Sequence, residues 1–385
     1  MKIRDVKVYP IAPDISEGRS RERQVGWVFV QIETDEGITG VGECTNWPRK
    51  GDIIVSHIVQ VLKESLIGQD PRHIEKLWHE MYRNYTYLGS RGPITTAISG
   101  INIALWDIVG KALGVPVYDL LGGPVRDSLL LYVHPRYGTP KEVADSGVSQ
   151  VVEGYTALKT DPFQAEMVKY HTAYIGGYIS REGEREGVRV IEALRNAVGP
   201  DIEILIDAHG HYNVATAMRC IRALQPYNIT WFEEPVPPEG LDALRQVRAQ
   251  TDMDLCTGER LYTRWDYLPV LREGLANYIM SDVCWTGGIS ELKKIATLAE
   301  TYYVPVSPHQ AMGPIQIIAG AHVMMTTPNF YRLEMVSRWM EAFNDCISPA
   351  LDVRGGALYL SNKPGLGVEL NMDYVKRHPD PDWTG

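Results

Sequence analysis

Short apolar runs alternate with helical stretches from about residue 129 onward, and this alternation limits the fold more than any other feature. Helical periodicity is clear at Gly187–Val198, Val214–Leu224, Leu241–Gln250 and Ile289–Glu300. The stretch 161–185 is predicted to form an extra excursion above the sheet. Eight strands alternating with helices predict an α/β fold of the (β/α)8-barrel type rather than an open sheet. The predicted strands are Leu129–Val133, Ala157–Thr160, Ile202–Asp207, Thr230–Phe232, Leu255–Thr257, Tyr278–Ser281, Val304–Val306 and Tyr331–Leu333.

The residues before this region follow a different pattern. Residues 1 to about 43 alternate apolar and polar side chains like antiparallel strands, with a mobile polar loop predicted over residues 16–23. Residues 52–120 are helical by period. We therefore expect an N-terminal α+β module over residues 1–125 and a barrel over residues 126–355. A tail over residues 356–385 is expected to return to the N-terminal module.

Composition excludes several classes of function. The formal net charge of −10 argues against non-specific nucleic-acid binding. No run reaches 18 uninterrupted apolar residues, so we expect no membrane span, and the N-terminus lacks the apolar core of a signal peptide. The five cysteines are odd in number, widely spaced and without a CxxC pair. Reduced thiols and a cytoplasmic location are therefore expected.

Three acidic residues end or follow successive predicted strands at intervals of 26 residues: Asp207, Glu233 and Glu259. The carboxyl ends of parallel barrel strands share one rim, so we expect these side chains to converge. Three crowded negative charges need a counter-ion, and carboxylate oxygens suit Mg²⁺ better than they suit zinc. The alternative is that each acid caps the following helix, but their common position relative to the strands favours a metal site.

A histidine and an aspartate are expected to pair at the same rim. Asp282 ends the sixth predicted strand and His309 follows the seventh, and neighbouring strands lie about 5 Å apart. Asp282 could accept the Nδ1–H of His309, fix its tautomer and raise its basicity, which would make a general base. The alternative is a structural histidine bonded to the backbone.

Further ionisable residues follow the second and third strands. His209 lies two residues after Asp207, on the same side of an extended chain, and is a candidate proton donor to a leaving hydroxyl group. His211 has the same phase but lies further into the loop, where a solvated histidine is equally plausible. Lys159 could hold a substrate carboxylate or transfer a proton, or pair with a neighbouring acid.

Several other residues complete the candidate site. Asp161 shares the phase of Lys159, and Glu334 follows the eighth strand. Glu334 could hydrogen-bond an enolate oxygen if protonated, or simply close the ring of charges. Trp47, Tyr87 and Arg91 belong to N-terminal segments that could cover the rim.

A series of short motifs resembles the enolase superfamily, in its mandelate-racemase-like subgroup. The resemblance spans almost the whole chain. It implies an N-terminal α+β capping domain on a modified TIM barrel, (β/α)7β. It also implies Mg²⁺ held by Asp207, Glu233 and Glu259, and abstraction of the proton α to a substrate carboxylate. The motifs are Ile103-Ala104-Leu105-Trp106-Asp107, Leu120-Leu121-Gly122-Gly123, Ile206-Asp207-Ala208-His209, Trp231-Phe232-Glu233-Glu234-Pro235, Gly258-Glu259-Arg260, Asp282 with Gly287-Gly288-Ile289, Ser307-Pro308-His309 and Pro364-Gly365-Leu366-Gly367.

Two details of these motifs narrow the implied reaction. Racemases of this superfamily carry Lys-x-Lys after the second strand, whereas this chain has Lys159-Thr160-Asp161 and lacks the second lysine. Asp207-Ala208-His209 is similar to the galactonate and gluconate dehydratases. The resemblance therefore implies a sugar acid (aldonate or aldarate) dehydratase, a hydro-lyase that forms a 2-keto-3-deoxy acid. His309 would remove the C2 proton and His209 would help to expel the C3 hydroxyl, although the two roles could be exchanged.

Two other classes of function stay open at this point. One is a racemase, epimerase or cycloisomerase on the same scaffold, and the other is a non-catalytic protein that binds an acid sugar. In the favoured interpretation the partner is a small-molecule sugar acid, with no nucleic acid or membrane, and the family implies a homo-oligomer, either a dimer or an octamer. The expected catalytic residues are His309, Asp282, His209 and Glu334, and the expected substrate-binding residues are Lys159, Asp161, His211, Trp47 and Arg91.

Overall fold

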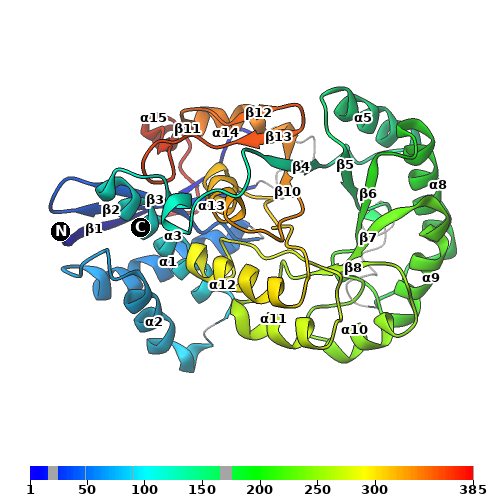
Figure 1. The fold of residues 1–385 in the computed structure, drawn as a ribbon, viewed down its shortest axis with the longest axis horizontal. Coiled ribbons are helices and arrows are strands. Elements are labelled where there is room, and N and C mark those ends of the chain that lie inside the picture. Colours follow the sequence, from blue (N-terminus) through cyan, green and yellow to red (C-terminus); the bar gives the residue numbers. More distant parts are fainter. Residues whose placement is uncertain (16–24, 48, 90, 165–175, 385) are drawn as a thin grey trace.

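The computed structural model describes residues 1–15, 25–47, 49–89, 91–164 and 176–384. Figure 1 shows two parts: a sheet with helices from the start of the chain, in blue and cyan, and a ring of strands and helices in green to orange. The loop predicted over residues 16–23 lies outside the described residues, as do residues 165–175 of the predicted excursion. The end of that excursion was predicted wrongly, because α8 (Arg181–Val198) already begins at Arg181, with Ser180 as its N-cap.

The N-terminal part is an antiparallel sheet covered by helices. Its strands are β1 (Ile3–Ile11), β2 (Trp27–Thr34) and β3 (Thr39–Glu43), in that order. Glycines at positions 40 and 42 of β3 allow α3 to approach, because a Cβ at either position would overlap backbone oxygens of that helix. α3 is long and apolar enough to cross a membrane, but 83% of its apolar window is buried, as in a core helix. The helices are α1 (Arg49–Leu66), α2 (Ile74–Asn84), α3 (Pro93–Leu113) and α4 (Val117–Leu120), with a 3-10 turn η2 (Thr86–Leu88).

The ring is a closed parallel barrel. Strands β4 to β9 pair in consecutive order, and β10 pairs with β4 to close the sheet. The strand predicted at Val304–Val306 was too long: only Val306 bridges its neighbours, Ile279 and Phe330. Prolines at 305 and 308 flank it and have no backbone N–H to donate. The strands are β4 (Leu129–Val133), β5 (Ala157–Thr160), β6 (Glu203–Asp207), β7 (Ile229–Glu233), β8 (Leu255–Thr257), β9 (Tyr278–Ile279) and β10 (Leu333–Met335).

The last barrel strand lies two residues later than predicted, because its pairing with β4 begins at Leu333 opposite Leu131.

Helices follow most strands and surround the barrel (Figure 1). Each connection from a strand to its helix therefore begins at the same rim of the barrel. The surrounding helices are α5 (Pro140–Val152), α8, α9 (Val214–Leu224), α10 (Leu241–Arg248), α11 (Thr263–Arg272), α12 (Gly288–Thr301) and α13 (Pro314–Met325).

The interior of the barrel is filled by large side chains. Tyr132, Trp231 and Met280 are fully buried there, in a cluster separate from the core between strands and helices. Trp231 also donates its Nε1–H to Oε2 of Glu233, at 3.1 Å. This packed layer supports the acidic residues at the strand ends and leaves the rim as the place for chemistry.

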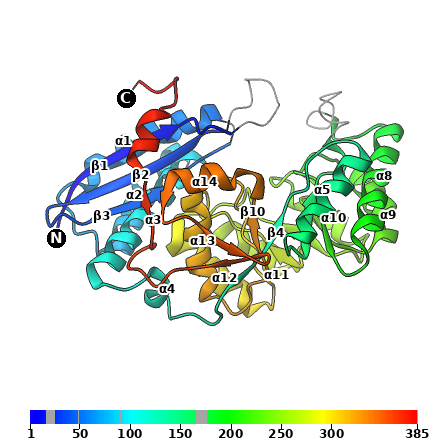
Figure 2. The ribbon, with the colours of Figure 1, turned by 90° about the horizontal axis from the view of Figure 1, so that it is seen from above.

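The C-terminal segment divides its contacts between the two parts. The hairpin of β12 (Asp352–Arg354) and β13 (Ala357–Tyr359) extends the barrel sheet, because β13 pairs antiparallel with β4. Later residues return to the N-terminal part, where Gly365 bridges Pro116 and Pro379 bridges Ile11. Figure 2 shows this end of the chain, in red, crossing the N-terminal strands. The remaining elements are η3 (Gln225–Tyr227), η4 (Ser337–Trp339), α14 (Met340–Cys346), β11 (Ile347–Ser348), β14 (Glu369–Leu370) and α15 (Met372–Arg377).

Two motif residues of α3 join these parts of the chain. Trp106 donates its Nε1–H to the hydroxyl of Ser290 on α12, at 2.9 Å. The buried carboxylate of Asp107 accepts the backbone N–H groups of Val41 and Leu366, at 2.9 and 2.8 Å. Their contribution is therefore to connect β3, α3, α12 and the C-terminal segment.

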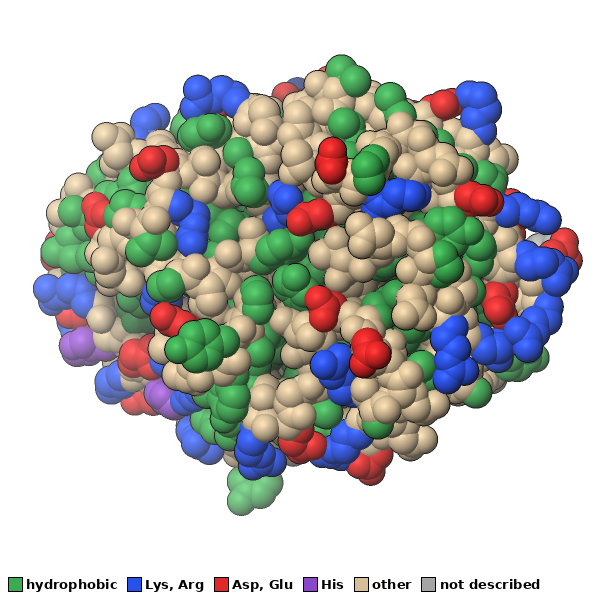
Figure 3. Space-filling model, turned by 45° about the vertical axis from the view of Figure 1, so that its right-hand side comes forward, with side chains coloured by type: hydrophobic (Ala, Val, Ile, Leu, Met, Phe, Trp, Pro, Cys, Tyr) green, Lys and Arg blue, Asp and Glu red, His purple; other side chains and the backbone are tan. Residues whose placement is uncertain are grey.

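Charge is mixed on the face shown in Figure 3, where basic and acidic side chains are interspersed. A single-sign field of the kind that attracts nucleic acid is not visible on that face.

A buried histidine makes the stability of this arrangement depend on pH. Nδ1 of His322 accepts the backbone N–H of Tyr118 at 3.2 Å, and Nε2 lies 3.1 Å from the carbonyl oxygen of Leu366, so the neutral tautomer satisfies both partners. Burial lowers the pKa of His322 to about 4. The folded-state pKa is below the unfolded value, so this stabilisation is complete above about pH 6.5 and is lost as the pH falls toward 4.

We expect His322→Gln, whose amide can make the same two bonds, to remove this contribution, which is about 3 kcal/mol for a group of this shift. Urea unfolding between pH 7 and pH 4.5 should show a smaller loss of stability for the variant than for the wild-type protein. His57→Gln, at an exposed histidine of α1, is the matched control and should follow the wild-type protein. Equal losses for His322→Gln and the wild-type protein would contradict the prediction.

Candidate active site

Three carboxylates converge at the carboxyl ends of adjacent strands. Asp207 ends β6 and lies directly opposite Glu233, which ends β7. Glu259 follows β8 by two residues, and one oxygen of each acid lies within 4.8 Å of the others. All three side chains are buried. The convergence predicted from the 26-residue intervals is therefore present in the fold.

A buried lysine partly neutralises these acids. Nζ of Lys159 lies 3.1 Å from Asp207, 3.0 Å from Glu233 and 2.9 Å from Glu334. Burial opposes the charged form of Lys159, but the carboxylates outweigh it and raise its pKa. Burial by itself would raise the pKa of Glu334, but the charge of Lys159 holds that pKa well below its usual value. Glu334 is thus ionised, which fits closure of the ring of charges rather than donation to an enolate.

The donor set of this cluster fits a hard divalent cation. Three buried carboxylates offer oxygen ligands, and one ammonium group cannot balance three or four negative charges. The strain of this crowding is visible at Glu233, whose pKa is raised by burial and by the neighbouring charge of Asp207. A cation held by these acids would remove that repulsion.

His309 and Asp282 form the expected pair. Nδ1 of His309 lies 2.6 Å from Oδ2 of Asp282. The other oxygen of Asp282, Oδ1, accepts the backbone N–H of Cys284 at 2.7 Å. Nε2 of His309 faces the acids, 3.7 Å from Glu259 and 4.0 Å from Glu334. Burial alone would lower the pKa of His309, but these negative charges raise it to about 9. The pair therefore presents a basic nitrogen to the cluster.

His209 forms a second imidazole–carboxylate pair, this time with Asp161. Its Nδ1 lies 3.4 Å from Asp161 and 3.5 Å from Asp207. Burial opposes protonation, but Asp207 and Asp161 raise the pKa of His209 to about 10. About a third of the side chain is exposed, so one edge of the ring is accessible from outside. The structure places Asp161 against His209, a contact that the sequence did not predict.

The backbone of His209 is held in an uncommon conformation. Its φ is +48°, in the left-handed region, and its N–H donates to Oδ1 of Asp207 at 2.9 Å. Arg260 donates to the carbonyl oxygen of His209 at 2.9 Å and through Nε to Glu234, also at 2.9 Å. Glu234 and Arg260 thus fix the loop that carries His209.

His211 differs from His209 although the two rings stack, with their centroids 5.5 Å apart. Burial, followed by the charge of His209, lowers the pKa of His211 to about 3. His211 is therefore neutral and unsuited to donating a proton. Together with Asp161 and His209 it forms a second cluster with metal-ligand spacing, but Asp161 is already engaged with the ring of His209.

The predicted covering residues belong to the N-terminal part and are largely exposed. Trp47 is half exposed and Tyr87 fully exposed, and Arg91 forms an ion pair with Asp266 at 2.9 Å. Within the ranges that the structure describes, no hydrogen bond or ion pair joins Trp47, Tyr87 or Arg91 to the acids at the rim.

The sequence reasoning missed several residues of the site. Nε2 of His134 lies 2.8 Å from Oε1 of Glu334, and the backbone N–H of Gln310 donates to Oε2 of Glu334 at 2.8 Å. His134 directly follows β4, so its position after the first strand could have identified it. The ring of Trp285 lies 5.0 Å from that of His309, and Gln316 donates to Asp282. These last two contacts join segments without any shared pattern in the sequence.

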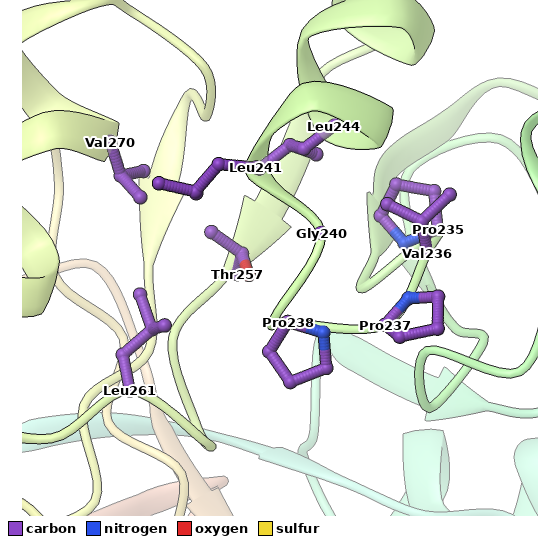
Figure 4. A pocket seen from close by; sticks show the side chains of 10 residues that line it. All are labelled: Pro235, Val236, Pro237, Pro238, Gly240, Leu241, Leu244, Thr257, Leu261 and Val270. Atoms are coloured by element: carbon purple, nitrogen blue, oxygen red, sulfur yellow. The ribbon is translucent and has the colours of Figure 1, made fainter.

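A small apolar pocket lies next to this centre, between the loop after Glu234 and helices α10 and α11 (Figure 4). Prolines 235, 237 and 238 form one side, and Leu241 and Val270 contribute from the helices. Among the described residues no ionisable side chain lines this pocket, whereas the three carboxylates gather at the rim.

A closed barrel with a buried carboxylate cluster and two imidazole–carboxylate pairs at its rim defines an enzyme of the enolase type. Family models support this class over most of the chain. Residues 4–122 match the mandelate racemase / muconate lactonizing enzyme N-terminal domain, and residues 142–374 match the enolase C-terminal domain-like family. The chain belongs to the mandelate racemase / muconate lactonizing enzyme family of the enolase superfamily. Members of this superfamily use a divalent metal with a Lys or His base.

Curated relatives match along nearly the whole chain. A D-galactonate dehydratase of Pectobacterium atrosepticum is 36% identical over 100% of this chain and 96% of its own length. A D-xylonate dehydratase of Haloferax volcanii is 32% identical over 98% and 90%. A D-galactarolactone cycloisomerase of Agrobacterium fabrum is 36% identical over 92% of each.

A solved structure agrees with the fold. The mandelate racemase/muconate lactonizing enzyme-like protein from Rubrobacter xylanophilus is 34% identical, with a TM-score of 0.90 over 100% of this chain and 98% of its own. The enolase-type fold expected from the sequence, a modified barrel with an N-terminal capping domain, is confirmed.

The charge balance of the cluster generates a test with metal. We expect Lys159→Met to destabilise the metal-free protein by about 3–5 kcal/mol, because it leaves buried carboxylates without their partner. Mg²⁺ should then raise the melting temperature of the variant more than that of the wild-type protein, since the cation no longer meets a competing ammonium group. Thermal unfolding in EDTA and in Mg²⁺ measures both effects.

Lys293→Met is the matched control, because Lys293 bonds Thr326 through its ammonium group, and no ion pair to the cluster is found among the described residues. Its response to Mg²⁺ should equal that of the wild-type protein. An equal response of Lys159→Met and the wild-type protein would show that the ammonium group and the cation do not share these acids.

Proposed function

We propose that the protein is a Mg²⁺-dependent sugar acid dehydratase, a hydro-lyase that removes the C2 proton and the C3 hydroxyl of an aldonate or aldarate. The observation that carries this proposal is the pair of histidines beside the carboxylate cluster. His309 lies 3.7 Å from Glu259 and His209 lies 3.5 Å from Asp207. Their carboxylate partners and exposures differ, which fits a base and an acid. The named galactonate and xylonate dehydratases among the relatives support the same reaction.

Asp207, Glu233 and Glu259 would hold the metal ion. When bound, Mg²⁺ would supply positive charge beside the substrate carboxylate, which makes the α-proton easier to remove. Lys159, which contacts Asp207 and Glu334, would orient that carboxylate. Glu334 and His134 would complete the polar wall on the side of β4 and β10.

His309 would accept the C2 proton at Nε2. Asp282 would accept the proton on Nδ1 of His309, which leaves the lone pair on Nε2 when the imidazole is neutral. Neutralising Glu259 removes one of the charges that raise the pKa of His309, which favours its neutral, basic form. The electrons of the broken C2–H bond pass into the substrate carboxylate as an enediolate.

His209 would then act as the general acid. With Asp207 on the metal, Asp161 would still favour the protonated imidazole, which would give this proton to the C3 hydroxyl as the C3–O bond breaks, releasing water. The resulting enol tautomerises to a 2-keto-3-deoxy acid. Asp161 orients this imidazole, and His211 flanks it as a neutral ring. Trp47 and Arg91 would contact the substrate from the N-terminal part.

The racemase interpretation is weaker. The second lysine of the racemase motif is Asp161 here, and this carboxylate lies 3.4 Å from Nδ1 of His209, where it favours the cationic form of the imidazole. A cationic imidazole suits loss of hydroxide as water better than removal of a second proton.

We also propose a cytoplasmic location and a homo-oligomer, either a dimer or an octamer, as is usual for this family.

Product analysis tests the reaction itself. With Mg²⁺ and a stereochemically complete set of aldonates and aldarates, we expect at least one substrate to give a keto acid that reacts with semicarbazide. An isomer of equal mass would instead indicate a racemase, epimerase or cycloisomerase. Absence of any α-proton exchange across the set would favour a non-catalytic binding protein.

Exchange in D₂O separates the two histidines. We expect His209→Asn to exchange the C2 proton of the substrate but to eliminate water at least about 100-fold more slowly, since the general acid contributes 10²–10⁴-fold. His309→Asn should do neither. Proton NMR of the substrate measures exchange and keto-acid formation together. Wild-type elimination by His209→Asn would refute its role as the acid.

A further inference from the structure

Glu43, at the end of β3 in the N-terminal part, caps a helix of the barrel. Helix α13 begins after Gly313, whose lack of a side chain leaves the helix without a cap of its own. The carboxylate of Glu43 supplies it: one oxygen accepts the backbone N–H of Gly313 at 2.8 Å and the other accepts that of Gln316 at 2.9 Å. Backbone N–H groups can only donate, so this geometry requires two acceptor oxygens.

The capped turn carries the side chain that holds Asp282. The amide nitrogen of Gln316 donates to Oδ2 of Asp282 at 2.6 Å, the same oxygen that lies 2.6 Å from Nδ1 of His309. The amide oxygen of Gln316 accepts the backbone N–H of Met312 at 2.9 Å, which fixes the orientation of the amide. Both the backbone and the side chain of Gln316 are thus held, and all of these groups are buried.

The same N-terminal segment reaches His309 by a second route. The carbonyl oxygen of Thr45, two residues after Glu43, accepts the indole N–H of Trp285 at 2.7 Å. The ring of Trp285 lies 5.0 Å from the ring of His309. The hydroxyl of Thr45 in turn donates to Glu43 at 2.7 Å. Residues 43–45 therefore reach both side chains beside the imidazole, Trp285 directly and Asp282 through Gln316.

The fit around Glu43 leaves little freedom. A Cβ at position 313 would lie 2.6 Å from the nearest carboxylate oxygen, so a side chain there would displace the carboxylate. Glu43 therefore fills the space beside Gly313, and both of its carboxylate oxygens accept backbone N–H groups.

We propose that Glu43 is a positioning residue for the His309–Asp282 base, acting through Gln316, so that the N-terminal part completes the barrel's catalytic centre. This inference rests on the proposed function of His309. Among the residues that the structure describes, no hydrogen bond or ion pair joins Glu43 to the metal-binding acids. Glu43 sets the position of Asp282, and through Asp282 the tautomer and direction of the imidazole.

Two variants and one matched control test this role, in full-length protein with Mg²⁺ at pH 8. Glu43→Gln keeps the shape but turns an N–H donor toward one of the two backbone N–H groups. Gln316→Met removes the side-chain bonds to Asp282 and Met312 but keeps the backbone N–H that Glu43 accepts. Asp107→Asn is the control, because Asp107 is also a buried carboxylate that accepts two backbone N–H groups between β3 and the C-terminal segment, but it lies outside the dyad's hydrogen bonds.

Both test variants should lower kcat about 10- to 100-fold with KM changed by less than about threefold, as expected when a catalytic group is misplaced. The Nδ1 proton resonance of His309, assigned with His309→Asn, should move upfield as its bond to Asp282 lengthens. The double variant should lose less than the product of the single effects. Asp107→Asn should lower the melting temperature and leave kcat and the resonance near wild type.

The proposal is overturned if Glu43→Gln keeps the wild-type kcat and resonance, or if Asp107→Asn changes them equally for the same loss of melting temperature. If Glu43→Gln fails to fold, Gln316→Met decides by the same two readouts. The resonance can be measured without substrate. If it shifts in Glu43→Gln while the wild-type protein forms no keto acid from any substrate, the positioning role is upheld and the proposed reaction is rejected.

Discussion

Three buried carboxylates surround one ammonium group at the barrel rim, a fourth, Glu259, lies beside them, and this excess of negative charge governs the site. Lys159 contacts Asp207, Glu233 and Glu334 within about the length of a hydrogen bond. Each acid would be costly to bury alone, and one lysine cannot neutralise them all. A centre built in this way has a strong need for a cation, and its negative charge raises the basicity of His309 and His209.

The two imidazole–carboxylate pairs share this physics but differ in geometry. His309 is buried, close to Asp282, and has its free nitrogen toward Glu259 and Glu334. His209 is partly exposed, has a longer contact with Asp161, and is held on a left-handed loop by Arg260. The first arrangement suits removal of a proton next to the cluster, and the second suits delivery of a proton to a group further out.

Sequence reasoning reached those parts of the site that follow from strand periodicity. Asp207 and Glu233 are opposite each other because parallel strands of equal phase place equivalent residues at one height. The same rule placed Asp282 and His309 together. It overestimated the strand at Val306, where flanking prolines prevent regular pairing. It missed Asp161 beside His209, because that contact depends on how two loops fold above the rim.

The contact between Glu43 and α13 was equally beyond a reading of periodicity, since its two partners are 270 residues apart in the chain. Its physical origin is nonetheless simple. A helix that begins with glycine has backbone donors without a local acceptor, and the buried end of such a helix must find one elsewhere. The acceptor comes from the N-terminal part, so separating the two parts would leave buried N–H groups and a buried carboxylate unpaired together. The position of Gln316, and with it the hydrogen bond to Asp282, therefore depends on the packing of the two parts rather than on the barrel alone.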